Sequence, residues 1–325
     1  MSKKIIWKDK IGEENISNSG DKMKIIDACS KKEITIQFED KTIVSNKQYR
    51  HFKSGNIRNP IIGVGNEFIS GHNEKYKIIK QYVDNGITKY DIEFECGVIV
   101  HGTQHSQTKH GDVKHPFTKS LFNIGYLGIG EYKPTMMCSD GIKRMTPQYN
   151  TWFNFLNRCY NKKYQMNKPT YEGCTVCDEW LNFQTFSKWY DDNYYQLGNE
   201  EMFLDKDILN KGNKIYSHAN CIFVTKPINS LFTKGDAGRG NLPIGVNKKS
   251  GRDDLYVEVS MGKKDGIRNR FYKGKFKTPE EAFNCYKTHK ESYIKQVADD
   301  YKSKYPNFPT KLYDAMYSYQ VEITD

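Results

Sequence analysis

The chain has 325 residues, which is too long for one ordinary hydrophobic core and long enough for two to four compact units. Lysine and arginine total 50 against 39 acidic residues, and 14% of the residues are aromatic, so the composition favours a polyanionic partner, although a basic soluble protein without such a partner has the same balance. No apolar run approaches the ~20 residues of a membrane helix, and the N-terminal segment lacks the apolar stretch of a signal peptide, so we expect a cytoplasmic protein without membrane contact.

Two copies of one module occupy the N-terminal third of the chain. Residues 34–60 align with residues 90–116 without a gap, and nine positions are identical at an offset of 56. Alternating apolar residues in the first of these runs indicate half-buried strands. We therefore predict two small β modules, at residues 1–70 and 71–135, that arose by duplication. The identical pairs are Ile36/Ile92, Phe38/Phe94, Glu39/Glu95, Ile43/Ile99, Val44/Val100, Gln48/Gln104, Lys53/Lys109, Gly55/Gly111 and Pro60/Pro116.

Matching loops end the two copies, with the sequences GNIRNP and GDVKHP. They place Arg58 and Lys114 at equivalent exposed positions, where each could contact phosphate or be a solvated cation. The second copy also carries four histidines, but the first copy has none at the matching positions, so we expect no metal there. The glycine-rich segment 124–144 that follows predicts a linker.

A helical pattern begins after Pro147. Trp152, Phe155, Leu156 and Cys159 recur at helical spacing and predict one buried face. Further along, Cys174 and Cys177 form a CxxC pair. A structural zinc needs four ligands and no second pair completes the set, so we expect all eight cysteines to be reduced thiols and expect no structural zinc.

The stretch Leu204–Phe232 has the residues most suited to chemistry. A first apolar run ends at Asp205 and Asp207, a second leads through a proline into a helix that carries Asn229, and the order predicts strand, loop, strand and helix. Asn220 precedes the second run and could brace the loop. Such an element can hold Asp205 and Asn229 across one small cleft, with room for a hard cation and its waters.

Residues 146–232 resemble the HNH (ββα-metal) nucleases of the homing-endonuclease type, which occur in phages and mobile elements. The resemblance covers about a quarter of the chain and rests on the run GNKIYSHANCIFVT and on the helix and the cysteine-containing turn before it. It implies a nuclease domain at residues 145–235, in which Asp205 and Asn229 hold a divalent metal, Mg²⁺ or Mn²⁺, and Asn220 braces the loop.

One residue departs from that family's pattern. The position after the first metal carboxylate usually holds the histidine that activates water, and here it holds Lys206. A lysine is a poor base unless desolvation lowers its pKa, although it could still stabilise charge on the transition state. Asp207 is the other candidate base, and His218 is expected to face solvent.

Residues 241–305 predict three short strands and then a helix that begins at Thr278. Within them, residues 243–290 resemble an ethylene-response-factor (Apetala-type) DNA-binding domain, whose sheet lies in the major groove, and the matching positions are Gly245, Val246, Tyr272, Gly274, Phe276, Glu281 and Ala282. The resemblance implies DNA contacts from Asn247, Arg270 and Tyr272, and the other basic residues would form a basic outer face. The full set of predicted contacts is Asn247, Lys248, Lys249, Arg252, Arg268, Arg270, Tyr272, Lys273 and Lys275.

The sequence therefore predicts a multidomain α+β protein, with duplicated small β modules, a ββα-metal nuclease core with flanking helices, and a three-stranded sheet plus helix, followed by a packed C-terminal extension at residues 306–325. The expected function is metal-dependent hydrolysis of double-stranded DNA, by nicking or cutting, in the cytoplasm of a host cell. The alternatives are a non-catalytic, sequence-specific DNA-binding protein with a degenerate HNH fold acting in phage regulation or defence, and a protein-interaction scaffold. The target site and the oligomeric state stay open.

Overall fold

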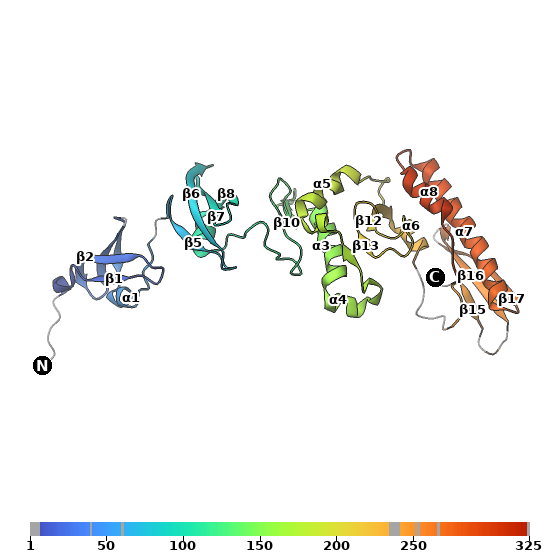
Figure 1. Cartoon of the computed structure of the whole chain (residues 1–325), viewed down its shortest axis with the longest axis horizontal. Coiled ribbons are helices and arrows are strands. Elements are labelled where there is room, and N and C mark those ends of the chain that lie inside the picture. Colours follow the sequence, from blue (N-terminus) through green and yellow to red (C-terminus); the bar gives the residue numbers. More distant parts are fainter. Residues whose placement is uncertain are drawn as a thin grey trace. The chain divides into compact units, whose positions relative to one another are not determined.

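The protein is a mixed α+β chain with several small, mostly antiparallel sheets, as the sequence predicts (Figure 1). This computed structural model describes residues 7–39, 41–59, 62–233, 241–249, 251, 254–264 and 267–323. The chain divides into two compact units, Met1–Pro116 and Phe117–Asp325. Within the described residues, no helix is both long and apolar enough to cross a membrane.

The first unit holds the two copies of the repeated module. Each copy is a four-stranded antiparallel sheet in sequential order, followed by one short helix. A short 3₁₀ helix, η1 (Trp7–Lys10), precedes the first copy. The elements of the first copy are β1 (Glu14–Ile16), β2 (Lys22–Ser30), β3 (Glu33–Phe38), β4 (Ile43–Lys47) and α1 (Tyr49–Lys53). Those of the second copy are β5 (Glu67–Ile69), β6 (Lys75–Asp84), β7 (Ile87–Phe94), β8 (Ile99–Gln104) and α2 (His105–His110).

The duplication extends further towards the N-terminus than the alignment at offset 56 indicates. Before the β2–β3 and β6–β7 hairpins the two copies match at an offset of 53, because the second hairpin is three residues longer. The backbone repeats too: the Gly12 amide donates to the Ile25 carbonyl and the Gly65 amide to the Ile78 carbonyl, both at 2.8 Å. Strand β5 precedes the predicted boundary at residue 70, yet it pairs with β6 in the second module. The further identical pairs are Gly12/Gly65, Glu14/Glu67, Ile16/Ile69, Ser17/Ser70, Lys22/Lys75, Lys24/Lys77, Ile25/Ile78 and Ile26/Ile79.

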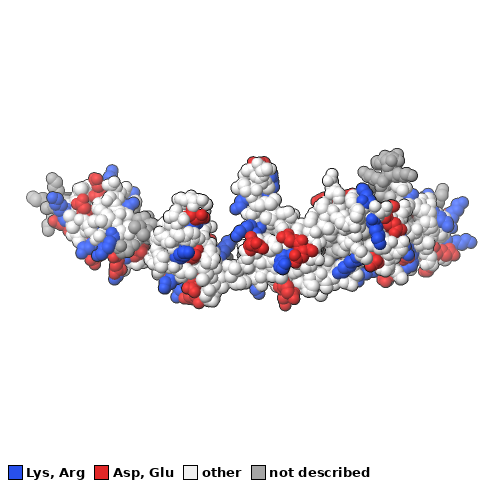
Figure 2. Space-filling view, turned by 90° about the horizontal axis from the view of Figure 1, so that it is seen from above, with Lys and Arg blue, Asp and Glu red and all other residues white. Residues whose placement is uncertain are grey.

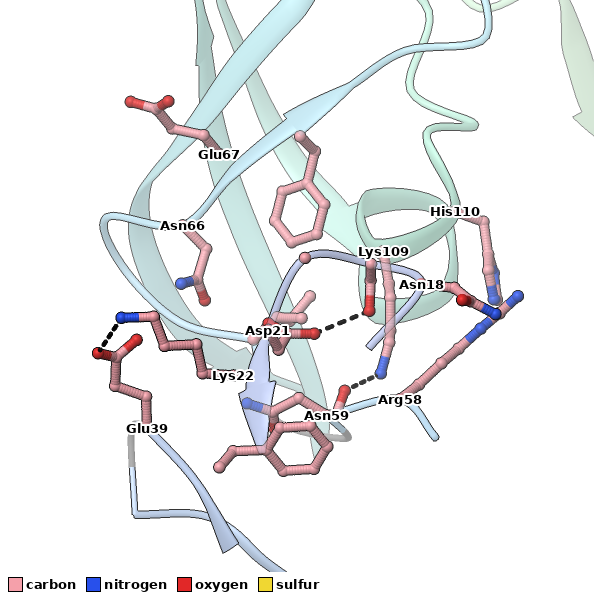
Figure 3. Close-up of a pocket in the computed structure, with 15 residues that line it drawn as sticks. Asn18, Asp21, Lys22, Glu39, Arg58, Asn59, Asn66, Glu67, Lys109 and His110 are labelled. Carbon is pink, nitrogen blue, oxygen red and sulfur yellow. Dashed lines mark hydrogen bonds and ion pairs between the residues drawn. The ribbon is translucent and has the colours of Figure 1, made fainter. Parts of the chain in front are cut away.

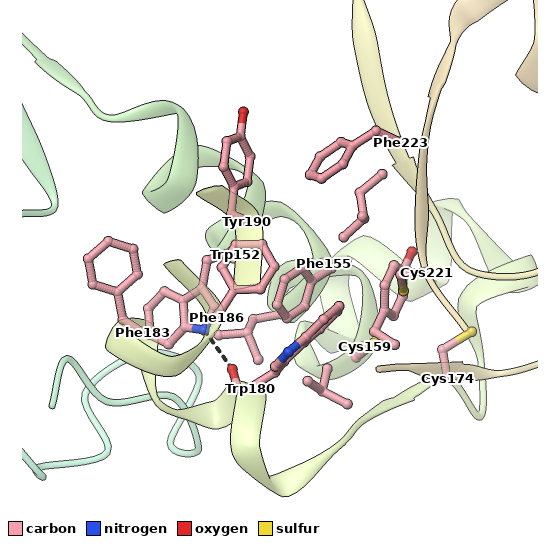
Figure 4. Packing of buried hydrophobic residues seen from close by; sticks show 14 residues of the cluster. Trp152, Phe155, Cys159, Cys174, Trp180, Phe183, Phe186, Tyr190, Cys221 and Phe223 are labelled. Atoms are coloured by element: carbon pink, nitrogen blue, oxygen red, sulfur yellow. Dashed lines mark hydrogen bonds between the residues drawn. The ribbon is translucent and has the colours of Figure 1, made fainter. Parts of the chain in front are cut away.

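An aromatic core opens the second unit (Figure 4). The helix predicted after Pro147 is α3 (Pro147–Tyr160), capped by the Thr146 hydroxyl, and its predicted face is buried. The indole of Trp152 donates to the Trp180 carbonyl at 2.7 Å and so ties α3 to the turn that follows the CxxC pair. The elements around this core are α4 (Lys162–Asn167), η2 (Pro169–Tyr171), β11 (Thr175–Val176), η3 (Asp178–Leu181) and α5 (Phe183–Asn193).

The segment 124–144 is not a linker, so that prediction is wrong. Ile124 and Leu127 pack against the aromatic core, and the segment also forms a hairpin of β9 (Thr135–Met137) and β10 (Lys143–Met145). Its glycines permit close packing rather than chain flexibility. A Cβ on Gly125 would lie 2.7 Å from a Leu156 methyl carbon, and one on Gly128 would overlap the Asn182 side chain.

Gly128→Ala is expected to destabilise the second unit by roughly 2 to 4 kcal/mol. Residue 128 has φ +70°, which costs an alanine about 1 to 2 kcal/mol, and the Asn182 amide must also move. Gly173→Ala is the matched control, because Gly173 has φ +74° with nothing within 4 Å of the added methyl. Urea unfolding of both variants measures the difference. Equal destabilisation of the two variants would mean that the positive φ alone, and not the contact with Asn182, destabilises Gly128→Ala.

The predicted strand, loop, strand and helix are present at residues 202–231. They are β12 (Met202–Asp205), β14 (Ile222–Thr225) and α6 (Lys226–Leu231), and the two strands pair antiparallel. The loop between them contains an element that the sequence did not predict, β13 (Ile215–Tyr216), which pairs in parallel with β11.

A three-stranded sheet and a long helix complete the second unit. The strands are β15 (Val246–Lys248), β16 (Leu255–Lys264) and β17 (Ile267–Phe276), all antiparallel, and the helix is α7 (Pro279–Lys304). The Thr278 hydroxyl caps α7 by accepting from the Glu281 amide at 3.2 Å, as predicted.

Helix α7 enters two hydrophobic cores. Near its start, Phe283 and Tyr286 pack on the sheet, and further along Ile294 and Ala298 pack on β14 and α6. The C-terminal extension forms α8 (Thr310–Ser318), whose fully buried Leu312 joins the second of these cores. The extension is therefore part of the support of the strand–loop–strand–helix element.

Candidate functional site

The acidic pair lies where β12 ends and its loop begins. The Oδ1 atom of Asp205 accepts the backbone amides of Asp207 at 2.9 Å and Ile208 at 2.8 Å. These bonds form a tight turn that fixes the Asp205 carboxylate, as short polar side chains do at the ends of strands. The turn leaves the Oδ2 atom of Asp205 for another partner.

Lys206 lies inside the loop and not at its surface. Its side chain is 9% exposed, and its ammonium group donates to Asp207 Oδ2 and to the Asn213 carbonyl, both at 3.0 Å. The Asn213 side chain in return donates to the Lys206 carbonyl at 2.7 Å. Lys206 is therefore a structural cross-brace of the loop.

Asn220 extends the same network. Its amide donates to Asn213 Oδ1 at 3.1 Å, and its Oδ1 accepts from the Asn210 side chain at 2.8 Å. The Asn220 side chain thus braces the loop through two other asparagine side chains, and its backbone amide donates to the Ser217 carbonyl at 3.2 Å. The network of Lys206, Asn210, Asn213 and Asn220 fixes the path of the loop that carries the acidic pair.

The surroundings of Asp205 and Lys206 affect the charges of the two side chains differently. Burial, and then the nearby Asp207 charge, raise the pKa of Asp205 to about 6, although the two backbone amides favour its ionised form. Burial disfavours the Lys206 ammonium, but the adjacent Asp207 carboxylate outweighs it and the pKa of Lys206 is raised. Lys206 therefore holds its proton at neutral pH, and it cannot serve as a base there.

Asn229 lies in α6, which packs against both β12 and β14. Its side chain is partly exposed, and the Thr225 hydroxyl caps the helix by accepting the Ile228 amide at 3.4 Å. Thr225 also donates to the Tyr301 hydroxyl of α7 at 3.2 Å, so α7 fixes the start of α6. No hydrogen bond joins the side chains of Asp205 and Asn229, both of which lie in the described part of the chain.

A hard cation with few protein ligands fits this donor set. Among the described residues, no three histidine, cysteine or acidic side chains gather to hold a metal ion. Mg²⁺ keeps several of its waters and needs only one or two protein carboxylates, so Asp205 and Asp207 are the residues here that could hold such an ion. His218 is exposed, as predicted.

The outer face of the sheet, opposite α7, carries an exposed aromatic pair. Tyr256 and Tyr272 lie with ring centroids 5.2 Å apart, and the Lys249 ammonium lies 5.7 and 5.4 Å from the two rings. Arg270 forms an ion pair with Glu258 at 3.0 Å. Asn247 pairs with Tyr256 across β15 and β16 and so shares this face.

Three of the predicted outer-face lysines lie elsewhere. The register pairs Lys273 with the fully buried Val257 and Lys248 with the buried Leu255, which places both lysines on the α7 side of the sheet. Lys275 has φ +73° and is the extra residue of a bulge between two strand pairs. Alternation along one strand could not reveal that bulge. Lys248 is exposed, whereas Arg252 and the side chain of Arg268 lie outside the described residues.

A pocket of about 700 Å³ lies in the first unit and includes Arg58 (Figure 3). Lys109 and His110 line it beside Arg58, and the Lys109 ammonium donates to the Asn59 carbonyl. Asp21, Glu39 and Glu67 line it too, so its charge is mixed. Lys114, the repeat equivalent of Arg58, is exposed as predicted.

On the face in Figure 2, lysine and arginine are interspersed with acidic residues and form no single basic stripe. No protein-family model, no curated protein and no solved structure matches the chain.

Proposed function

We propose that this protein is a metal-dependent endonuclease that acts on double-stranded DNA, of the HNH (ββα-metal) kind that residues 146–232 resemble. The observation that carries the proposal is the element β12–loop–β14–α6, which holds a constrained acidic pair at the end of β12 and a partly exposed asparagine amide on the helix that packs against both strands.

Asp205 and Asn229 are the proposed metal ligands, with Asp207 beside them. A divalent cation there would neutralise charge on the scissile phosphate and on the leaving 3′ oxygen. A positive charge beside Asp205 would also stabilise the ionised form of this carboxyl, whose pKa burial and then the nearby Asp207 charge raise. Asp207 Oδ1 is then the carboxylate oxygen that we propose accepts a proton from water, because Asp207 Oδ2 already accepts a hydrogen bond from Lys206.

The proposed recognition surface is the outer face of the β15–β17 sheet, in the manner of the Apetala-type domain that it resembles. Arg270, Tyr272, Asn247 and Lys249 lie on or beside this face, whereas Lys248 pairs with the buried Leu255 and so lies on the other face. Aromatic rings offer contact to bases or thymine methyl groups, and Lys249 offers contact to phosphate. The tyrosine pair and the lysine that covers it support this role.

A plasmid cleavage assay tests the proposal. Wild-type protein with Mg²⁺ or Mn²⁺ is expected to convert supercoiled DNA to nicked or linear product, and Asp205→Ala and Asn229→Ala to lose at least 100-fold in rate, while Asp192→Ala on the surface of α5 keeps wild-type activity. Supercoiled DNA that stays intact with every metal, on DNA that carries this reading frame as well as on plasmid, contradicts the proposal.

A second function is favoured by one observation, the buried and protonated Lys206. At the position where the nucleases that this chain resembles carry a base, this chain carries a lysine that braces the loop. Such a chain could bind DNA without cleaving it, as a regulator or in defence. In that case salt-dependent binding to duplex DNA persists in EDTA and Asp205→Ala keeps its affinity. Binding that disappears with the metal argues against this second function.

A further inference from the structure

The hairpin of β9 and β10 exposes apolar side chains along both strands. All three residues of β10 are exposed, as are two of the three in β9. Met137 is 69% exposed, Ile142 is 55% exposed and Met145 is 48% exposed. A two-stranded hairpin is only marginally stable in water, so such side chains would ordinarily be covered.

The hairpin is nevertheless held in one conformation. At its tip the Cys138 amide donates to the Ile142 carbonyl at 3.0 Å, and Arg144 binds both oxygens of Asp140 at 3.0 and 2.6 Å. At its base the Thr146 hydroxyl donates to the Lys133 carbonyl at 2.9 Å. The exposed side chains therefore project from a preformed ribbon.

Methionines and basic residues lie on both faces of this ribbon. The register pairs Lys143 with Met137 and Arg144 with Met136, and residues paired in this way share a face. One face therefore presents Met137 and Met145 beside Lys143, and the other presents Met136 beside Arg144, which is ion-paired with Asp140. A flat protein surface would cover only one such face, whereas a groove with two walls covers both.

We propose that the β9–β10 ribbon enters the major groove of duplex DNA. The major groove admits a two-stranded β ribbon, its walls are phosphate, and its floor carries thymine methyl groups and base edges. Lys133 and Lys143, which form no ion pair within the described residues, suit the phosphates, and the methionines suit the apolar floor. The inference rests on the proposed action on DNA and adds a second contact element, apart from the sheet of β15–β17.

Methionine oxidation on the wild-type chain tests the contact directly. The protein is treated with hydrogen peroxide, with and without a saturating 30-base-pair duplex, and sulfoxide formation at each methionine is followed by mass spectrometry. DNA is expected to slow oxidation of Met136 and Met137 at least fivefold. Met166 on α4, which is 82% exposed, is the internal control and is expected to oxidise at an unchanged rate.

Fluorescence anisotropy on the same samples measures duplex binding itself and so distinguishes failure of the ribbon contact from failure of the proposed function. Binding of the duplex without protection of Met136 and Met137 overturns the ribbon contact and leaves the proposed function standing. Absence of binding at low salt overturns both. Protection by anionic lipid vesicles or by an added protein, but not by DNA, also overturns the contact.

Paired variants give a second readout, and both sites are exposed, so folding is not at risk. Met137→Ser and Lys143→Gln are each expected to weaken duplex affinity about tenfold, and Lys143→Gln also to reduce the salt dependence of binding by about one phosphate contact. Met166→Ser and Lys163→Gln on α4 are the matched controls, with expected affinity within twofold of wild type. Equal affinities for the ribbon variants and their controls would overturn the contact.

Discussion

Asp205→Asn is expected to abolish cleavage and, at the same time, to make the protein more stable at neutral and alkaline pH. An asparagine keeps the Oδ1 atom that accepts the two backbone amides of the turn, at 2.8 and 2.9 Å, but it removes a charge that burial and Asp207 disfavour. The proposed role of Asp205 as a metal ligand would account for a carboxylate whose charge is unfavourable to its own fold.

The pH dependence gives the sign and size of this effect. The pKa of Asp205 is raised from 3.8 to about 6 on folding, so the folded protein binds this proton more tightly than the unfolded chain does. Its contribution to stability is complete below about pH 4 and is lost as pH rises through about 6. As pH rises over that range, the free energy of unfolding of the Asp205→Asn variant should therefore increase relative to wild type, by at most about 3 kcal/mol at pH 8.

Thermal unfolding at pH 4, 6 and 8, with and without Mg²⁺, measures both effects. Mg²⁺ is expected to stabilise wild type at pH 8 and not the Asp205→Asn variant, because binding to the folded state adds stability. Asp192→Asn, an exposed carboxylate in an ion pair on α5, is the control and should change stability by less than about 1 kcal/mol. An asparagine variant less stable than wild type at pH 8 contradicts this account of the turn.

Leu312→Ala in the C-terminal extension is expected to destabilise the β12–β14–α6 element by about 2 to 5 kcal/mol, the usual cost of deleting a fully buried leucine. Leu312 is fully buried in a core with Val224, Ile228 and Leu231, more than eighty residues earlier in the chain. The cavity would therefore open beneath the helix that carries Asn229.

Hydrogen exchange of the amides in β14 and α6 measures this effect. In the Leu312→Ala variant, exchange in β14 and α6 should accelerate as strongly as exchange in α8 does. Asp314→Ala, an exposed position on the same helix, should leave exchange in β14 unchanged. Acceleration confined to α8 would mean that the extension is only a peripheral addition.

Local periodicity predicts most elements of this fold. The face of α3, the cap of α7 and the order of β12, β14 and α6 follow from spacing and capping residues within one segment. The glycines at 125 and 128 misled the prediction, because a glycine demanded by close packing against Leu156 or Asn182 has the same letter as a glycine in a flexible linker.

The candidate site was only partly predictable for a similar reason. The positions of Asp205 and Asn229 on a strand end and a helix follow from the pattern. The burial of Lys206 and its bonds to Asp207 and Asn213 depend on how the loop folds back, and the sequence between residues 206 and 213 has no periodicity that indicates it. Strand β13 was missed because its parallel partner, β11, lies forty residues earlier in the chain and local patterns do not reveal such a pairing.

Helix α7 has a further consequence for how this chain can change in evolution. Its 26 residues enter one core at Phe283 and another at Ile294, without a break between them. Each residue inserted between these two positions would rotate one core against the other by about 100°, and a deletion would do the same in the opposite sense. The length of this helix between the two positions is therefore fixed, and insertions or deletions there should not be tolerated.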